Sequence, residues 1–76
     1  MNDKRRRKLR TAITFLDNAN TIIGDVLDEE RDALDNWPEP LQESAKYIES
    51  EDACDTLDEV AEYIADAREM LHEVSH

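Results

Sequence analysis

Both prolines of this 76-residue chain fall near its middle, at Pro38 and Pro40, and divide it into two long halves. A proline removes a backbone donor, clashes with the preceding helical turn and restricts the residue before it, so no helix continues through this stretch. Glycine, the other strong helix breaker, occurs only once, at Gly24. The sequence therefore predicts two helices joined by a hinge at residues 36–43.

Apolar residues recur at spacings of three and four on both sides of the hinge, which predicts helices over residues 4–35 and 44–74. Ser44 and Ser50 are candidate N-caps of the second helix. The short hinge makes the helices antiparallel neighbours, so we expect an all-α helical hairpin in a single domain, residues 1–76. A heptad seam is expected in the second helix along Ala53, Leu57, Val60, Ile64, Ala67, Leu71 and Val74.

Each helix has an apolar face nearly twice as wide as a two-helix contact needs. Two helices that only face each other would leave apolar flanks in water. We therefore expect two hairpins to associate as a homodimer, forming a four-helix bundle. A monomeric hairpin with an exposed groove for another partner and a higher oligomer are the alternatives.

Two polar residues interrupt the apolar face of the first helix. Glu30 lies well inside the face and near the antiparallel register of Lys46. An ion pair between them, with Asn20 as a second polar insert, would fix the register at some cost in stability. Alternatively, the first helix rotates enough to expose Glu30 to water.

Charge is distributed unevenly along the chain. Six basic residues against Asp3 give the N-terminal tip, residues 1–10, a net charge of +5, whereas residues 11–76 carry three basic and 19 acidic residues, a net charge of −16. An acidic body argues against a broad nucleic-acid- or membrane-binding surface. No apolar run has the length of a membrane span or follows the basic start as in a signal peptide. With Cys54 as the one cysteine, we expect a cytoplasmic protein.

The basic tip allows two interpretations. In an antiparallel hairpin it would lie beside the end of the second helix, where Glu69 and Glu73 neutralise it. Alternatively, the tips of two or more chains bind a nucleotide, an oligonucleotide or another phosphate-bearing ligand. Aromatic residues do not interleave with the basic ones, so base stacking is not supported. The candidate anion-binding residues are Arg5, Arg6, Arg7 and Arg10.

The solvent side of the second helix carries like charges at i,i+4, and each such pair costs a few tenths of a kcal/mol. High solubility or a saline host explains this pattern simply. The carboxylates also suit a contact with a protein partner, or a nucleic-acid mimic that occupies the nucleic-acid site of a host enzyme. The candidate residues of this acidic face are Asp55, Asp58, Glu59, Glu62 and Asp66.

Catalytic and metal-binding motifs are weak in this sequence. It has no glycine-rich phosphate loop, and Cys54 has no histidine nearby in sequence. Glu69-x-x-His72 has the spacing found in di-metal bundles, but by helical phase Glu69 points to solvent. We therefore expect no enzymatic activity, no metal site and no cofactor.

The hinge segment DEERDALDNWPEPLQES resembles that of a family of small acidic helical-hairpin proteins from Gram-positive bacteria and their prophages. The second helix departs from the family pattern with Tyr63 and Arg68. The resemblance implies the hairpin fold and a phage or mobile-element origin, but no activity, because none is assigned to the family. The matching residues are Ala33, Asp35, Asn36, Pro38, Glu39, Leu41, Gln42 and Ser44.

Together these features predict a non-enzymatic protein-interaction module, such as a phage-encoded modulator or inhibitor of a host protein. An oligomeric anion- or nucleotide-binding protein and an acidic nucleic-acid mimic are the alternatives. Trp37 continues the apolar phase of the first helix, so it either plugs the bundle end against Leu41 and Ile48 or is the exposed centre of a binding loop. The candidate hinge contacts are Trp37, Pro38 and Leu41.

Overall fold

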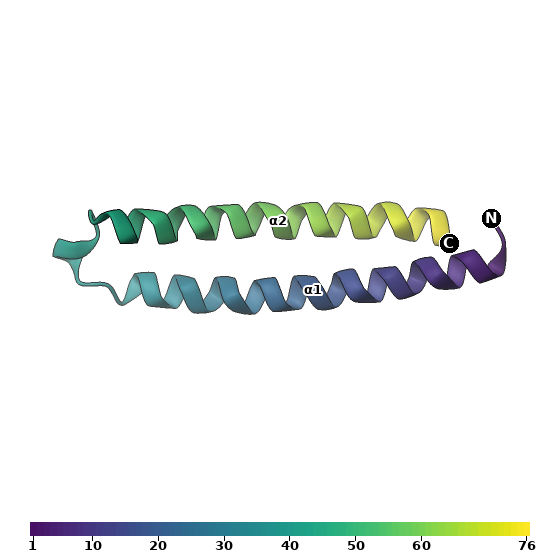
Figure 1. Ribbon diagram of the computed structural model, residues 1–76, viewed down its shortest axis with the longest axis horizontal. Helices are drawn as coiled ribbons and strands as arrows, with labels where there is room; N and C mark the ends of the chain where they lie inside the picture. Colours follow the sequence, from purple (N-terminus) through teal and green to yellow (C-terminus); the bar gives the residue numbers. More distant parts are fainter.

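A computed structural model describes all 76 residues as two long helices joined by a short helical turn. Helix α1 spans Asp3–Asp35, the 3-10 helix η1 spans Glu39–Leu41 and α2 spans Ala45–Ser75. The long helices lie side by side and antiparallel, with the hinge at one end and both termini at the other (Figure 1). The predicted all-α hairpin is confirmed, with helix bounds within one residue of those expected. Neither helix contains an apolar stretch long enough to cross a membrane.

Polar caps fix where each long helix begins. The Asn2 side chain accepts a hydrogen bond from the backbone N–H of Arg5 at 2.9 Å, at the start of α1. The Ser44 hydroxyl accepts one from the backbone N–H of Tyr47 at 3.3 Å, at the start of α2. Between the helices, Pro38 is extended and begins the 3-10 turn. The caps satisfy backbone donors that have no partner inside a helix, so the sequence sets these boundaries locally.

The two helices meet along one seam, in which residues are spaced alternately three and four apart. Every seam residue is buried or half-buried. The α1 residues of the seam are Leu9, Ile13, Leu16, Asn20, Ile23, Leu27, Glu30 and Leu34, and those of α2 are Tyr47, Ser50, Cys54, Leu57, Ala61, Ile64, Arg68, Leu71 and Ser75.

The seam of α2 is rotated from the predicted one. Leu57, Ile64 and Leu71 lie in it as expected, but every second position shifts by one residue. As a result, side chains that were expected to be central are half-buried or exposed at its edge. Cys54, Ala61, Arg68 and Ser75 occupy the places predicted for Ala53, Val60, Ala67 and Val74.

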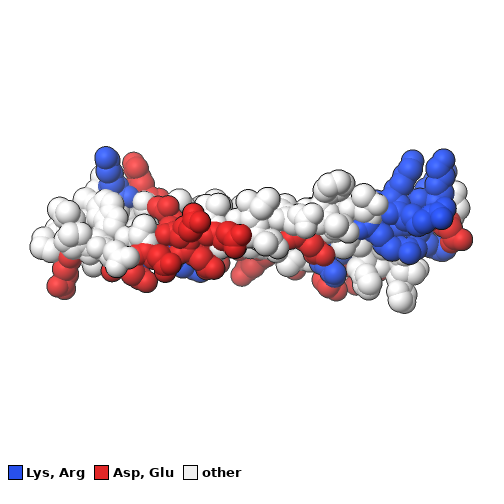
Figure 2. Space-filling view, turned by 90° about the horizontal axis from the view of Figure 1, so that it is seen from below, with Lys and Arg blue, Asp and Glu red and all other residues white.

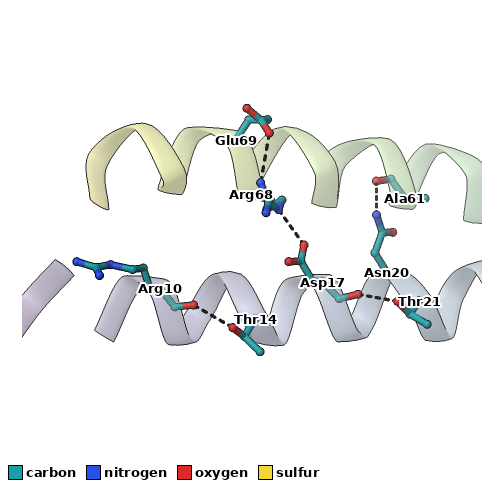
Figure 3. A network of polar contacts seen from close by, with 8 residues as sticks. All are labelled: Arg10, Thr14, Asp17, Asn20, Thr21, Ala61, Arg68 and Glu69. Carbon is teal, nitrogen blue, oxygen red and sulfur yellow. Dashed lines mark hydrogen bonds and ion pairs between the residues drawn. The ribbon is translucent and has the colours of Figure 1, made fainter. Parts of the chain in front are cut away.

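Two ion pairs between the helices give a physical reason for this rotation. Arg68 Nε lies 2.9 Å from Asp17 Oδ1 (Figure 3), and Arg31 pairs with Asp58. A hairpin can bury only part of a wide apolar arc, and with the part around Cys54 buried both ion pairs join α1 to α2. Apolar periodicity by itself centres the seam on apolar residues alone.

The core of the hairpin is thin. Only five of the 76 residues are buried, and no large side chain is fully enclosed. The radius of gyration is 17.3 Å, whereas a compact domain of this length has one of about 11 Å. A chain this small that buries so little is marginally stable unless something else supports it. The buried residues are Ile13, Leu27, Leu34, Cys54 and Ser75.

Candidate interaction surfaces

The hairpin has two different faces, one on each side of the seam. Arg31 and Asp58 each directly follow a seam residue, and they pair across the helices. Arg10 and His72 also follow seam residues, and they line one pocket. The positions after the seam therefore share one face. Because both helices are right-handed and they run in opposite directions, the positions directly before a seam residue share the opposite face.

The face formed by the positions before the seam is largely apolar. Its four largest apolar side chains are exposed, with Phe15 at 69%, Met70 at 67%, and Ile22 and Tyr63 each at 63%. We call this surface the apolar face. It consists of Ala12, Phe15, Ala19, Ile22, Val26 and Ala33 of α1 and Ala53, Val60, Tyr63, Ala67, Met70 and Val74 of α2.

The sequence predicts apolar flanks that are exposed to water, but it does not predict that the flanks of α1 and α2 lie on the same face of the hairpin. The signal was present, because each apolar-face residue directly precedes a seam residue. It becomes visible only once the seam of α2 is placed correctly, and the predicted seam was displaced at every second position.

The acidic residues predicted on α2 are all exposed, but they do not form one compact patch. We call the face formed by the positions directly after a seam residue the polar face, because polar and charged residues such as Thr21 and Arg31 dominate it. Asp55, Asp58 and Glu62 follow seam residues and lie on the polar face. Glu59 and Asp66 are turned further round, toward the outer side of α2. Two of the five have partners: Asp58 pairs with Arg31, and Glu59 accepts a hydrogen bond of 2.9 Å from the Tyr63 hydroxyl.

The basic tip lies at the open end of the hairpin, where α1 extends beyond the end of α2 (Figure 1). Basic side chains gather there, and the largest group of acidic ones in this view lies over the half nearer the hinge (Figure 2). The one ion pair of the tip joins Arg6 Nη1 to Asp3 Oδ1 at 3.2 Å. The expected pairing of the tip with Glu69 and Glu73 does not form, and Glu69 instead lies 3.4 Å from Arg68 Nη1. The basic charge is therefore largely unmatched within one chain.

An open pocket of about 280 Å³ lies where α1 passes the end of α2, and Arg10, His72, Ser75 and His76 line it. The two imidazole rings are tilted, with centroids 5.7 Å apart. Of the four predicted anion-binding arginines, only Arg10 lines this pocket, whereas Arg5, Arg6 and Arg7 lie outside it. No group of three or more potential metal ligands forms anywhere in the chain.

The hinge places Trp37 against the start of α2. Its indole ring is half-buried and meets the Tyr47 ring edge-on, with centroids 5.6 Å apart. Leu41 and Ile48, the residues predicted to lie under a Trp37 plug, remain about half exposed. Pro38 is exposed as well. Trp37 thus covers the end of the seam through Tyr47, and Pro38 and Leu41 remain open to a partner.

The polar inserts of α1 behave differently from each other. The predicted ion pair between Glu30 and Lys46 does not form; Glu30 is half-buried at the seam and Lys46 is exposed. Asn20 does reach across the seam, and its Nδ2 donates to the Ala61 carbonyl at 3.4 Å (Figure 3). Asn20 Oδ1 is buried without a partner. Asn20 is therefore the insert that links the two helices.

Comparison with models of known protein families, with curated proteins and with solved structures finds no match for this chain. The family resemblance of the hinge therefore stays a prediction. What the protein does has to be argued from its own surfaces.

Proposed function

We propose that this chain is a non-enzymatic protein-interaction module that binds through its apolar face. The observation that carries the proposal is the alignment of exposed apolar side chains from both helices on one side of the seam. Monomeric proteins rarely expose contiguous apolar patches larger than a few hundred Å², and larger patches with a polar rim mark interaction sites.

The thin core supports the same proposal. A second layer of helices on the apolar face would remove from water the side chains that α1 and α2 leave exposed, and so would complete the core. A protein surface suits this face better than a lipid surface does, because the net charge of −11 repels anionic headgroups. The proposed partner is therefore helical and apolar at the contact.

In this proposal the module self-associates as a homodimer, as the width of its apolar faces predicted. A dimer would leave the hinge contacts Trp37, Pro38 and Leu41 free, together with the acidic residues of α2. Those surfaces are proposed to bind a further protein in the cytoplasm. The family resemblance implies a phage or mobile-element origin, and a chain of that origin could act as a modulator of a host protein.

The chemistry of the chain supports a role without catalysis. The Cys54 thiol is buried, and desolvation by burial raises its pKa, with a smaller contribution from Glu30. The two histidines lie at the far end of the hairpin, beside Arg10. A protonated, enclosed thiol without a neighbouring histidine is a poor nucleophile. The pocket at the open end offers one cationic side chain, which is few for the phosphates of a nucleotide.

The test compares the proteins recovered from the native cells by tagged wild-type chain and by two variants. Phe15→Glu places a charge on the apolar face, and Thr21→Glu places the same charge on the polar face. We expect Phe15→Glu to lose the proteins that wild type recovers, whether these are untagged copies of the chain or another protein. Thr21→Glu should retain them. Equal recovery by Phe15→Glu would refute the proposal.

A further inference from the structure

We infer that the occupant of the apolar face is a second copy of this chain, docked face to face with the two hinges at opposite ends of a four-helix bundle. The inference rests on the proposed function, namely that the apolar face is an interaction surface. It adds the relative orientation of the two copies and the residues that meet.

On α1, the larger side chains of the apolar face lie on both sides of the small residue Ala19, the midpoint of the helix. Phe15 and Ile22 lie four residues before and three after it, and Ala12 and Val26 lie seven before and seven after. Two α1 helices that cross antiparallel at Ala19 place Phe15 of one copy beside Ile22 of the other. They also bring the two Ala19 side chains together, where small residues allow the helices to approach closely.

On α2, larger side chains likewise lie on both sides of a small residue, Ala67. Tyr63 and Met70 lie four residues before and three after it, and Val60 and Val74 lie seven before and seven after. The ion pair that links Asp17 and Arg68 places the two alanine centres at nearly the same height in the hairpin. One two-fold axis through that height therefore relates both stripes to their copies, as a closed dimer requires.

The two hairpins could dock with their hinges at opposite ends or with their hinges together, and the part of α2 nearer the hinge distinguishes these orientations. Between the hinge and Val60, the apolar-face side of α2 carries Lys46 and Glu49 as well as Ala53. With hinges at opposite ends, the two α2 helices overlap only over residues 59–75 and leave that polar part in water. With hinges together, each α2 would lie along the whole α1 of the other copy, and Lys46 and Glu49 would be covered. The distribution of polar residues thus favours opposite hinges.

Charge complementarity favours the same orientation. The tip holds six basic residues between positions 4 and 10, and α1 extends beyond α2 there without cover. With hinges at opposite ends, the tip lies level with residues 28–34 of the second copy, which carry four acids and one arginine. Lys8 then falls beside Glu29 of the second copy, and both directly precede seam residues. With hinges together, both tips would gather at one end and repel each other.

The contact is also large enough for a stable dimer. The α1 pair overlaps over about 50 Å and the α2 pair over about 25 Å, and each helix is about 10 Å wide, so the flat contact covers about 750 Å² per copy. A specific protein interface buries about 800 Å² per partner. The accessible area of the ridged helix surface exceeds its flat projection, so the contact reaches that size.

The first test measures mass by sedimentation equilibrium. Wild type should have twice the 8.8 kDa mass of one chain. Ile22→Glu should weaken dimerisation at least about 100-fold, because each copy brings an unpaired charge into the contact. Thr21→Glu, on the polar face, should remain dimeric. Ile22 is largely exposed in the single hairpin, so circular dichroism should show helix in both variants. A monomeric wild type, or a dimeric Ile22→Glu variant, would overturn the inference.

The second test reports orientation by disulfide formation in a Cys54→Ala background. With opposite hinges, Ala19→Cys cross-links with itself on oxidation, because Ala19 lies at the two-fold axis. Ala12→Cys does not cross-link with itself, but does so when mixed with Val26→Cys. With hinges together, Ala19→Cys would cross-link only when mixed with Ala67→Cys, and that result would overturn the proposed orientation.

The two proposals can fail separately. A wild-type chain that stays monomeric, yet recovers another protein in a manner lost in Phe15→Glu, overturns the second-copy inference and leaves the interaction module intact. A dimer that is indifferent to every change on the apolar face overturns both.

Discussion

Replacing Asn20 with leucine should stabilise this protein, although it removes a hydrogen bond between the helices. Asn20 is a seam residue whose Nδ2 donates to the Ala61 carbonyl at 3.4 Å, near the upper limit for such a bond. Its Oδ1 is buried and has no partner. Asn20 therefore contributes a weak bond and keeps an acceptor out of water.

The expected gain follows from three contributions. Losing the long hydrogen bond costs about 0.5 kcal/mol, and removing the unpaired acceptor returns about 1 kcal/mol. A leucine at this half-buried position gains about 1.5 kcal/mol, the lower end of the range for a buried leucine. The net gain is about 2 kcal/mol, and at 4–8 °C per kcal/mol for a chain of this size the melting temperature rises by about 8–16 °C.

Thermal unfolding followed by circular dichroism at 222 nm measures this change, with every protein at one concentration because the melting of a dimer depends on concentration. Asn18→Leu is the matched control, since Asn18 is exposed on the outer side of α1, and its melting temperature should barely move. If Asn20→Leu melts lower than wild type, the hydrogen bond outweighs the unpaired acceptor and the reasoning is wrong.

Three further predictions concern the seam. Leu27→Ala removes three carbons from one of the few buried positions, so urea denaturation should show a loss of about 2–3 kcal/mol. Burial, and then Glu30, raise the pKa of the Cys54 thiol above its ordinary value of 9.0. The neutral buried thiol therefore contributes its full stability below that pH, and this contribution is lost as the pH rises above it. Urea titrations at several pH values should show this alkaline loss in wild type but not in Cys54→Ala. Arg68→Met breaks a partly exposed ion pair with Asp17, so its melting temperature should change by the equivalent of less than about 1 kcal/mol, and added salt should reduce the difference.

The parts of the fold that local chemistry decides could be predicted from the sequence. Pro38 and Pro40 forbid a continuous helix, and the Ser44 hydroxyl supplies the cap that starts α2. The rotation of α2 about its own axis depends on pairings between the helices. Asp17 and Arg68 are 51 residues apart in sequence, and no periodicity within one helix reveals their contact.

The same distinction separates what could and could not be predicted about the surfaces. The basic tip and the acidic residues of α2 were visible as charge patterns. The pairing of the tip with Glu73 failed because α1 extends beyond α2, an offset set by the register of the seam rather than by composition. The apolar face could be recognised only after the seam had been located, because it is defined by position relative to seam residues.

The distribution of side chains between the seam and the apolar face links folding to association. At the seam, α2 alternates large residues such as Ile64 with small or polar ones such as Ser50 and Ala61, whereas Tyr63 and Met70 are left outside. A hairpin stabilised as a monomer would have its largest apolar residues in the seam. Here the seam supplies register and orientation, and most of the apolar area remains to be buried against a partner. Folding and association are then linked, because the second layer of helices adds the hydrophobic stabilisation of the apolar face to the smaller contribution of the seam.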